Sequence, residues 1–272
     1  MNKIEKRMIE ILNKLRDEYS VVQLKAEFEA EASRMNELMR LKEIGNMCGL
    51  GLLVKIGGAE DISHMFDALH LGVNGLNAPM IETGFAARKF FKGVKKYIPI
   101  DDLEHMEISV NIETKTAHQN LDQILSEKDV DVLNAITIGR VDLVDSFDLT
   151  RTEINNQRIY DVCEDIFSKA RAKKLKCGLG GGISTDAVPF IKKLADKKLI
   201  DKYETRKIVF TNLKDEIDCM VEGILTAVEF ETLWLQNKKE YYGRIFREDD
   251  VRIEMLNKRL KKEISNSDLL CR

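Results

Sequence analysis

Two acidic residues follow successive predicted strands and offer the most specific chemistry in the sequence. Glu113 closes the segment SVNIE, just before a helix expected to start near Thr114, and Asp142 follows ITIGRV, in the loop expected after the next strand. Adjacent strands of a barrel lie about 4.8 Å apart. Two carboxylates at neighbouring strand tips can therefore share one divalent cation and leave positions for water and substrate oxygens. A plainer interpretation also fits: Glu113 caps its helix and Asp142 makes a turn.

Further charged residues lie at the ends of two other predicted strands. Lys55, in VKIGG, is placed where a cation could hold a substrate carboxylate or stabilise a developing enolate, although it could equally pair with a nearby acid. The stretch KAEFEAE puts Lys25, Glu27 and Glu29 on one expected strand face. Burying three charges together would require partners, a metal or water. An ordinary solvated edge strand would explain them as well.

A glycine cluster and four histidines are weaker candidates. The segment GLGGGIS (178–184) offers backbone N–H groups and room for a phosphate or carboxylate, but a tight turn needs glycines too. His64, His70 and His118 fall within predicted helices and His105 at a strand start, so we expect surface or packed residues rather than bases. No nucleophile elbow, P-loop or dinucleotide fingerprint is found.

The elements that must position these residues alternate along the chain. A helix is predicted at 2–18 and a strand in 21–31, and residues 214–264 are predicted to be almost wholly helical. Between them, helices alternate with strands predicted at 49–58, 72–83, 105–114, 131–143, 176–184 and 205–211. This order indicates parallel strands joined by right-handed helical crossovers, as in an α/β protein of the TIM (β/α)8-barrel type.

The barrel prediction leaves one strand unassigned. Seven strands are recognisable, so either a short strand is hidden or the barrel is modified at its N-terminal edge, and a doubly wound open sheet is the alternative. In a TIM barrel the active site lies at the carboxyl ends of the strands. The strands that end in Gly or polar residues before each helix would bring their tips to that rim.

No composition break divides the chain, so we predict one domain over 1–272. It comprises an N-terminal helix at 1–19, a barrel core at 20–211 and a C-terminal helical segment at 212–272. Residues 216–235 are apolar over more of the helix circumference than one buried stripe needs. We therefore expect this segment to pack on a partner subunit of a homo-oligomer, with packing inside the subunit as the alternative.

Composition excludes several classes of protein. Of 272 residues, 43 are Lys or Arg and 46 are Asp or Glu, a net charge of −3 that disfavours a nucleic-acid-binding surface. No run of 18 apolar residues predicts a membrane span, and the N-terminus lacks the apolar core of a signal peptide. Five cysteines are scattered without CxxC spacing, as expected of ordinary core residues in a cytoplasmic protein.

Three segments, in the correct order, resemble motifs of the HpcH/HpaI aldolase and citrate lyase β-subunit family. They are LVKIGG…LGVNGLNAPMIET (53–83), VNIETKTAHQNLDQIL (110–125) and ITIGRVDLVDSF (136–147). The resemblance runs from about Lys25 to Gly182. Members of this family have a TIM barrel of the phosphoenolpyruvate/pyruvate type, so the resemblance implies that fold here.

The resemblance also implies a site and a cofactor. Glu113 and Asp142 would bind Mg²⁺ or Mn²⁺, and the backbone around Gly139, Arg140 and Val141 would receive a keto-acid carboxylate. In these lyases the cation chelates the carboxylate and carbonyl of a pyruvate-like unit and stabilises its enolate while a C–C bond breaks or forms.

Two departures from the family pattern affect the expected reaction. The aldolases usually have Arg where this chain has Lys55, and Lys cannot make a planar bidentate contact. They also carry an Asp-x-Glu-His stretch with a catalytic His where this chain has KAEFEAE, which contains no histidine. The scaffold and metal site could therefore persist while the substrate or base differs.

The leading hypothesis is a cytoplasmic, divalent-metal-dependent carbon–carbon lyase or aldolase acting on a pyruvate-like keto acid or related carboxylate. Lys55 would be the electrostatic stabiliser, Glu27 or Glu29 would act in acid–base chemistry or support, and Lys25 would contact substrate. Two alternatives are a non-catalytic or regulatory barrel that keeps the metal or ligand site, and a phosphate-ligand enzyme that uses GLGGGIS.

Overall fold

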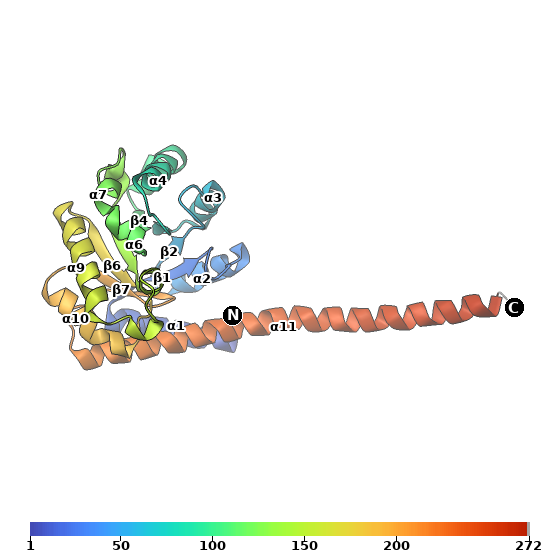
Figure 1. Ribbon diagram of the computed structural model, residues 1–272. Coiled ribbons are helices and arrows are strands. Elements are labelled where there is room, and N and C mark those ends of the chain that lie inside the picture. The colour runs from blue at the N-terminus through green and yellow to red at the C-terminus, as the bar shows by residue number, and fades with distance from the viewer. Residues whose placement is uncertain (271–272) are drawn as a thin grey trace.

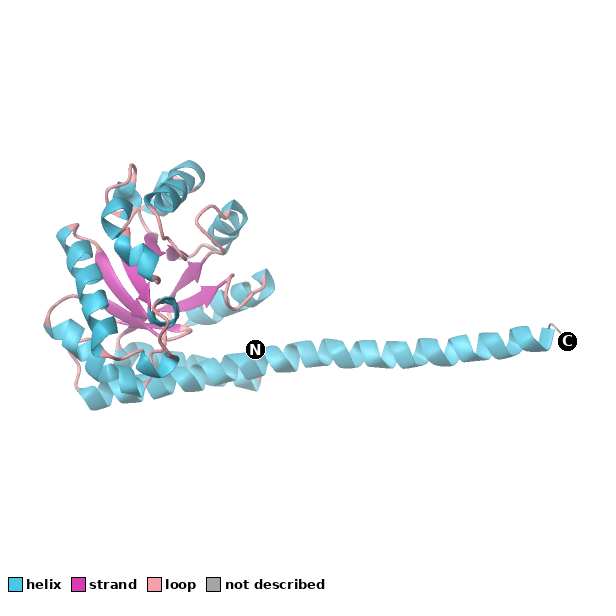
Figure 2. Cartoon of the chain, viewed as in Figure 1, coloured by secondary structure: helices cyan, strands magenta, loops and turns pink. Residues whose placement is uncertain are grey.

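The chain forms a closed barrel of eight strands surrounded by helices, with one long helix projecting from it (Figures 1 and 2). The computed structural model describes the backbone of residues 1–270 and the side chains of residues 1–264. The strands are β1 (Val21–Glu27), β2 (Gly51–Lys55), β3 (Gly75–Ala78), β4 (Glu107–Asn111), β5 (Ala135–Gly139), β6 (Lys176–Gly180), β7 (Lys202–Glu204) and β8 (Ile208–Phe210).

The helices lie outside the barrel and connect most of its strands. They are α1 (Lys3–Tyr19), α2 (Met35–Met47), α3 (Ile62–Leu71), α4 (Gly84–Tyr97), α5 (Ile100–Leu103), α6 (Lys115–Gln119), α7 (Leu121–Ile124), α8 (Arg140–Ser146), α9 (Gln157–Ala172), α10 (Val188–Asp196) and α11 (Ile217–Leu270). Short 3₁₀ turns are η1 (Val130–Val132), η2 (Arg151–Glu153) and η3 (Thr185–Ala187).

The strand order confirms the TIM-type barrel and excludes the open sheet. Strands β1 to β7 pair in parallel with their sequence neighbours, and β8 closes the ring against β1. The strand that sequence reasoning did not find is β7, whose three residues are too few to show a periodic pattern.

The last strand departs from the expected parallel series. Strand β8 runs antiparallel to both β7 and β1, so the expectation that segment 205–211 continues the parallel order is wrong. Only residues 205–207 separate β7 from β8. Two parallel strands need a crossover of about a dozen residues or more, so this short connection can form only a hairpin. The hairpin tip lies at the carboxyl ends of the parallel strands, beside the mouth of the barrel.

Several strands are also shorter than expected, and the end of β5 determines where Asp142 lies. The segment 131–143 contributes only β5, which ends at Gly139, and Asp142 lies in the first turn of α8 rather than in a loop. Likewise, the segment 72–83 contributes only β3, which ends just before Pro79. Proline has no N–H to donate to the ladder, which accounts for that end.

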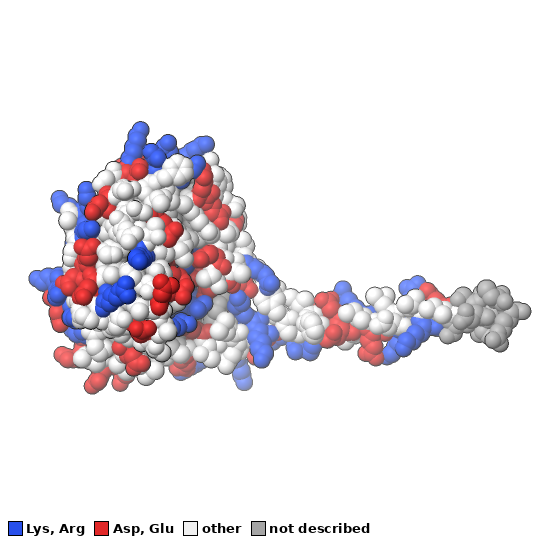
Figure 3. Space-filling view, viewed as in Figure 1, with Lys and Arg blue, Asp and Glu red and all other residues white. Residues whose placement is uncertain are grey.

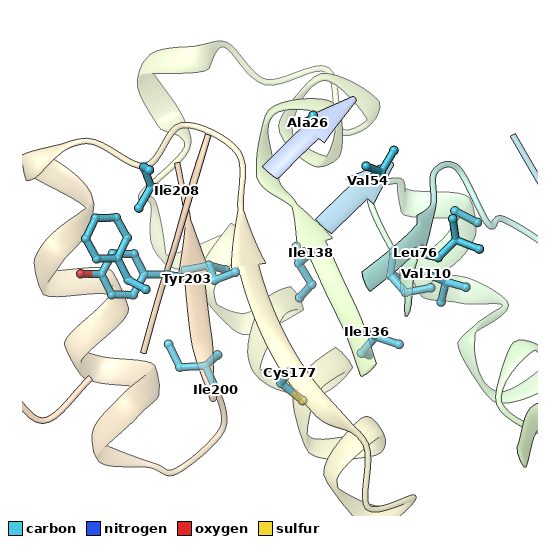
Figure 4. Close-up of a cluster of buried hydrophobic side chains, with 14 of the residues drawn as sticks. Ala26, Val54, Leu76, Val110, Ile136, Ile138, Cys177, Ile200, Tyr203 and Ile208 are labelled. Carbon is cyan, nitrogen blue, oxygen red and sulfur yellow. The ribbon is translucent and has the colours of Figure 1, made fainter. Parts of the chain in front are cut away.

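The hydrophobic core lies between the barrel wall and the helices. Figure 4 shows apolar side chains from the strands, including Val54, Leu76, Val110 and Ile136, all of them buried. The alternate positions face a polar barrel interior, where Asn77 Nδ2 donates to Ser109 Oγ at 2.8 Å. Strand alternation thus gives one apolar face to the core and one polar face to the lumen.

The described cysteines are free thiols, and most of them are buried. Cys48, Cys163 and Cys177 are buried free thiols and Cys219 is partly buried, whereas Cys271 lies outside the described residues. Within the described chain, no helix combines the length and apolarity that crossing a bilayer would need.

Helix α11 has 54 residues and two different environments. Its first part packs against α1 and the barrel, where Met220, Ile224, Phe230 and Trp234 are buried. Its second part extends away from the barrel (Figures 1 and 2) and carries both signs of charge along its length (Figure 3).

Candidate active site

A cavity of about 370 Å³ opens at the carboxyl ends of the strands. Strands β1, β2, β4, β5, β6 and β7 each contribute lining residues, together with the glycine turn after β6 and the β7–β8 hairpin. A larger cavity of about 780 Å³ lies at the amino ends, lined by residues that include Glu107 and Lys176. Glu107 is already paired with Lys202 and Lys176 there. We place the candidate site at the carboxyl ends, where barrels of this type carry their chemistry.

Glu113 lies in this cavity with a fixed orientation. Its side chain is only 2 % exposed, its Oε1 accepts a hydrogen bond from the Met80 N–H at 2.9 Å, and its Oε2 accepts one from Asn111 Nδ2 at 2.9 Å. The cap of α6 is Thr114, whose hydroxyl oxygen accepts from the Ala117 N–H at 3.0 Å. The interpretation of Glu113 as a helix cap is therefore wrong.

Asp142 is the second acidic residue of the site, and Gly139 leaves space for the side chain of the first, Glu113. Asp142 is exposed and lines the same cavity as Glu113. A Cβ on Gly139 would lie 2.2 Å from Glu113 Oε2, so a side chain at this position would occupy the space of the carboxylate. The absence of a side chain at Gly139 is what allows Glu113 to reach the cavity.

The electrostatics of the pair favour a bound cation. Burial raises the pKa of Glu113, the Lys55 ammonium acts against that rise, and the Asp142 carboxylate adds to it. Burial likewise raises the pKa of Asp142, again opposed by Lys55. A cation between the two carboxylates would favour their ionised forms.

The donor set fits a hard divalent cation held by few protein ligands. Each oxygen of Glu113 accepts one hydrogen bond and keeps a further lone pair, and hard cations such as Mg²⁺ are commonly bound by one or two carboxylates plus water and substrate oxygens. Within the described residues, no three His, Cys, Asp or Glu side chains gather in a metal-binding arrangement. Glu113 and Asp142 would thus leave most coordination positions to water and substrate.

The charged residues of β1 and β2 pair with one another. Lys25 Nζ lies 2.7 Å from Glu204 Oε1 and 3.1 Å from Glu27 Oε1. Lys55 Nζ lies 2.9 Å from Glu29 Oε2 and 3.6 Å from Glu27 Oε2. Strand β1 ends at Glu27, so Glu29 lies in the bend beyond it and the expectation that all three residues share one strand face is wrong for Glu29. The chain turns there, and the side chain reaches Lys55 from the bend.

These pairs keep Lys25, Lys55 and Glu27 ionised despite burial. Burial acts to lower the pKa of Lys25, but the Glu204 and Glu27 carboxylates outweigh it and raise that pKa. The pKa of Lys55 is also raised, because Glu27 and Glu113 outweigh its burial. For Glu27, burial acts to raise the pKa, but Lys25 and Lys55 lower it. At neutral pH the site therefore holds two ammonium groups and an ionised Glu27.

Arg140 does not line the cavity, in contrast to the expectation from the sequence, because its side chain turns into the protein. The guanidinium is fully buried, with Nη1 donating to Asn155 Oδ1 at 2.7 Å and Nη2 donating to the Gly182 carbonyl at 3.2 Å. Gly139 and Val141 line the cavity. A Cβ on Gly181, whose φ is +74°, would lie 2.5 Å from the Arg140 backbone nitrogen. The glycine turn of 178–184 thus packs closely on the start of α8, and the Arg140 side chain holds it in place.

Sequence reasoning missed several residues that line the cavity. They include Asn111, Thr137, Arg151, Glu204, Arg206 and Glu231. Asn111 and Thr137 lie two residues before Glu113 and Gly139, so strand alternation alone could have placed them on the same face. Glu204 lies on the three-residue β7, and Arg206 lies in the unexpected hairpin.

Comparisons with known proteins agree with this architecture. A crystal structure of an HpcH/HpaI aldolase from Desulfitobacterium hafniense DCB-2 matches with a TM-score of 0.59 and 16 % identity, covering 75 % of this chain and 82 % of that one. The citrate synthase SbnG matches with a TM-score of 0.59 and 15 % identity, covering 83 % and 89 %.

A third solved structure gives the widest coverage of these three. It is an HpcH/HpaI aldolase/citrate lyase family protein from Burkholderia cenocepacia J2315, which matches with a TM-score of 0.55 and 13 % identity over 88 % of this chain and 99 % of that one. At these identities the likeness shows the fold alone. No curated protein matches the sequence significantly.

The family is shown by the sequence itself. The family model for HpcH/HpaI aldolase/citrate lyase matches residues 33–188, more than half of the chain, and this range includes β2 to β6 with Lys55, Glu113 and Asp142. The chain belongs to the HpcH/HpaI aldolase/citrate lyase family.

Proposed function

We propose that the protein is a divalent-metal-dependent carbon–carbon lyase or aldolase that acts on a pyruvate-like keto acid. The observation that carries this proposal is the pair Glu113 and Asp142 beside the charged Lys55 in one cavity at the carboxyl ends of the strands. Family membership supports the reaction class, and the donor set supports Mg²⁺ or Mn²⁺.

Glu113 and Asp142 would hold the cation. Bound there, Mg²⁺ or Mn²⁺ would act as a Lewis acid toward the keto acid and offset the negative charge of its enolate. Lys55 stays protonated and adds a positive charge to the cavity that Glu113 and Asp142 line. The backbone of Gly139 and Val141 would face the keto-acid carboxylate.

No histidine is among the described residues that line the cavity, so we assign proton transfer to another group. Glu27 lines the cavity and is ionised, so it is able to accept a proton, with Lys25 and Lys55 holding its two oxygens in place. We assign the base role to Glu27. Glu29 does not line the cavity, but its carboxylate contacts the Lys55 ammonium. We assign it the role of positioning that ammonium group. Lys25 lines the cavity while bound to Glu204, and we assign it a positioning role beside the substrate.

The test is exchange of the pyruvate methyl protons in D₂O, followed by NMR with Mg²⁺ or Mn²⁺ and with EDTA. We expect metal-dependent exchange in the wild type that is lost in Glu113→Gln and Asp142→Asn. Asp145→Asn is the matched control, because Asp145 is exposed on the same helix, α8, and does not line the cavity. Tight Mn²⁺ binding without exchange would contradict the proposal and favour a non-catalytic barrel that retains its metal site.

We also propose that the protein is a homo-oligomer assembled through α11. The expected contact stretch 216–235 buries many of its apolar residues inside the subunit, but the projecting part leaves an apolar stripe uncovered. Phe246, Ile253, Leu256 and Leu260 are each at least 55 % exposed and fall on one side of the helix by their spacing of seven, three and four residues.

The charges of the projecting part leave that stripe available to a second copy. The ion pairs Glu240–Arg244 and Glu254–Lys258 form within the helix at i,i+4 spacing on the side opposite the stripe, whereas Glu248–Arg252 and Arg259–Glu263 flank it. A second α11 packed on the stripe would cover it without breaking these pairs. Sedimentation should therefore show a dimer or larger species that dissociates in the double variant Ile253→Asp/Leu260→Asp. A monomeric wild type would contradict the proposal.

A further inference from the structure

Helix α11 reaches the wall of the cavity through Glu231. The Oε1 atom of this residue accepts two hydrogen bonds from the tip of the β7–β8 hairpin, one from Thr205 Oγ1 at 2.7 Å and one from the Lys207 N–H at 2.9 Å. Thr205 and Lys207 are both buried, so loss of this acceptor would leave donors of two buried residues without their partner. A single carboxylate oxygen of α11 therefore holds both sides of the hairpin tip.

The hairpin in turn holds the segment that joins β1 to α2, residues 28–34, which we call the β1–α2 bend. The buried Lys207 ammonium pairs with Glu31 of this bend. The oxygen that it contacts, Glu31 Oε2, also accepts a hydrogen bond from the Glu27 N–H at 3.3 Å. Glu31 thus closes the bend onto the end of β1, and Lys207 fixes Glu31 to the hairpin.

The β1–α2 bend positions acidic groups of the proposed chemistry. Glu27, to which we assign the base role, lies directly before it, and Glu29 lies within it, 2.9 Å from the Lys55 ammonium. Ala32 has a φ of +47°, a left-handed conformation that costs an alanine energy and persists only where surrounding contacts hold it. The shape of the bend, and with it the position of Glu27, therefore depends on contacts such as those of Glu31.

The far end of the bend is anchored to the same long helix. Glu37, in the first turn of α2, accepts hydrogen bonds from Lys238 Nζ at 2.9 Å and from Tyr242 Oη at 2.7 Å, both on α11. Glu37 Oε2 also accepts from the N–H of Arg34, the last residue of the bend, at 3.2 Å. Helix α11 is therefore linked to both ends of the β1–α2 bend by side chains between residues 231 and 242.

We propose that Glu231 is a positioning residue for proton transfer, which acts through the hairpin and Glu31 to set the position of Glu27 at the cavity. This inference rests on the proposed function, which assigns the base role to Glu27. Glu31, Lys207 and Glu231 lie outside residues 33–188, the range that matches the family model, so family membership does not by itself imply this network. The helix proposed to join two subunits would then also support the active site.

Three substitutions of Glu231 separate the reach of its oxygen from its charge. Both hairpin donors to Glu231 are neutral, so reach is what the network requires. Glu231→Gln keeps an oxygen at the same distance along the side chain, Glu231→Asp keeps the charge but is one methylene group shorter, and Glu231→Ala removes the acceptor.

The first readout is exchange of pyruvate methyl protons. We expect kcat of Glu231→Gln to stay within about threefold of the wild type and kcat of Glu231→Asp and Glu231→Ala to fall at least about tenfold. The KM for pyruvate and the Mn²⁺ affinity should change little, because Glu113 is held by Met80 and Asn111 instead.

Glu229→Ala is the matched control and should leave exchange unchanged. Glu229 is exposed two residues earlier on α11, pairs with Arg7 at 2.9 Å and does not line the cavity. Wild-type kcat in Glu231→Asp and Glu231→Ala, or a larger loss in Glu231→Gln than in Glu231→Asp, would overturn the proposal. If Glu231→Ala does not fold, the comparison of Glu231→Asp with Glu231→Gln decides.

Hydrogen–deuterium exchange of the backbone amides separates this inference from the proposed function, because it requires no turnover. Peptides that cover residues 27–34 should exchange faster in Glu231→Asp and Glu231→Ala than in the wild type and Glu231→Gln, whereas α9 should not change. Unchanged protection of residues 27–34 in these two variants would overturn the inference alone. Faster exchange there, in a protein that does not exchange pyruvate protons, would retain the anchoring of the bend and reject the lyase.

Discussion

Replacing Gly139 with alanine should disable the proposed metal site although Glu113 and Asp142 are both retained. The added Cβ would lie 2.2 Å from Glu113 Oε2, whereas ordinary contacts begin near 3.4 Å. The carboxylate would have to move by about 1 Å, because the closely packed barrel wall that holds Gly139 cannot easily shift. Such a movement breaks the 2.9 Å hydrogen bond from Asn111 Nδ2 and exceeds the few tenths of an ångström that metal–ligand distances tolerate.

We expect Gly139→Ala to weaken Mn²⁺ binding at least about 100-fold and to lower the free energy of unfolding by about 1–3 kcal/mol. Mn²⁺ affinity is measured from the EPR signal of the free ion, and stability by urea unfolding without metal. Gly58→Ala is the control, because no atom lies within 4 Å of its added Cβ. Wild-type Mn²⁺ affinity in Gly139→Ala, or equal weakening in Gly58→Ala, would show that Gly139 does not control the position of the Glu113 carboxylate.

Two further predictions concern stability. Lys25→Met leaves the buried Glu204 carboxylate without its cation and should cost about 3–5 kcal/mol in urea unfolding, whereas Lys14→Met at an exposed position should change little. Adding Glu204→Gln to Lys25→Met should recover part of the loss, and no recovery would contradict the pairing. The Arg40 hydrogen bonds lower the pKa of Glu5 from 4.5 to about 2, so its stabilising effect is present above pH 4.5 and is lost as the pH falls toward 2. Glu5→Gln should therefore lower the free energy of unfolding by about 2–3 kcal/mol at pH 7 and by much less at pH 2, and a pH-independent difference would argue against it.

The carboxylate pair could be found from sequence because its position depends on a regular pattern. Glu113 and Asp142 each follow a strand of a parallel series, and parallel neighbours bring their carboxyl ends to one rim. The error in placing Asp142 in a loop rather than in α8 is small, since the first helical turn after a strand still faces that rim. Lys25 and Lys55 followed from the same alternation of strand residues.

The closure of the barrel could not be found in this way. A strand of three residues, such as β7, is too short to show an alternation of apolar and polar residues. The segment TRKIVFT contains no pattern that indicates whether its strand runs parallel or antiparallel to its neighbours. The antiparallel β8 is decided by the length of its connection, which becomes visible only once β7 is recognised. Glu204 and Arg206 were missed for that reason.

The Arg140 side chain illustrates a different limit. Its neighbours Gly139 and Val141 line the cavity, but its guanidinium turns into the protein toward Asn155 and Gly182. That direction depends on contacts with residues 15 and 42 positions away, which local patterns do not contain.

We propose that enolate formation from pyruvate requires a cation held by Glu113 and Asp142, and the proposed function depends on this requirement. It is tested most directly by measuring exchange of pyruvate methyl protons across a Mn²⁺ titration of the wild type, with Mn²⁺ binding followed in the same samples. We expect exchange to rise from the EDTA baseline and to reach half its maximum at the Mn²⁺ concentration that half-fills the site. Exchange at full rate in EDTA, or a filled site without exchange, would contradict it.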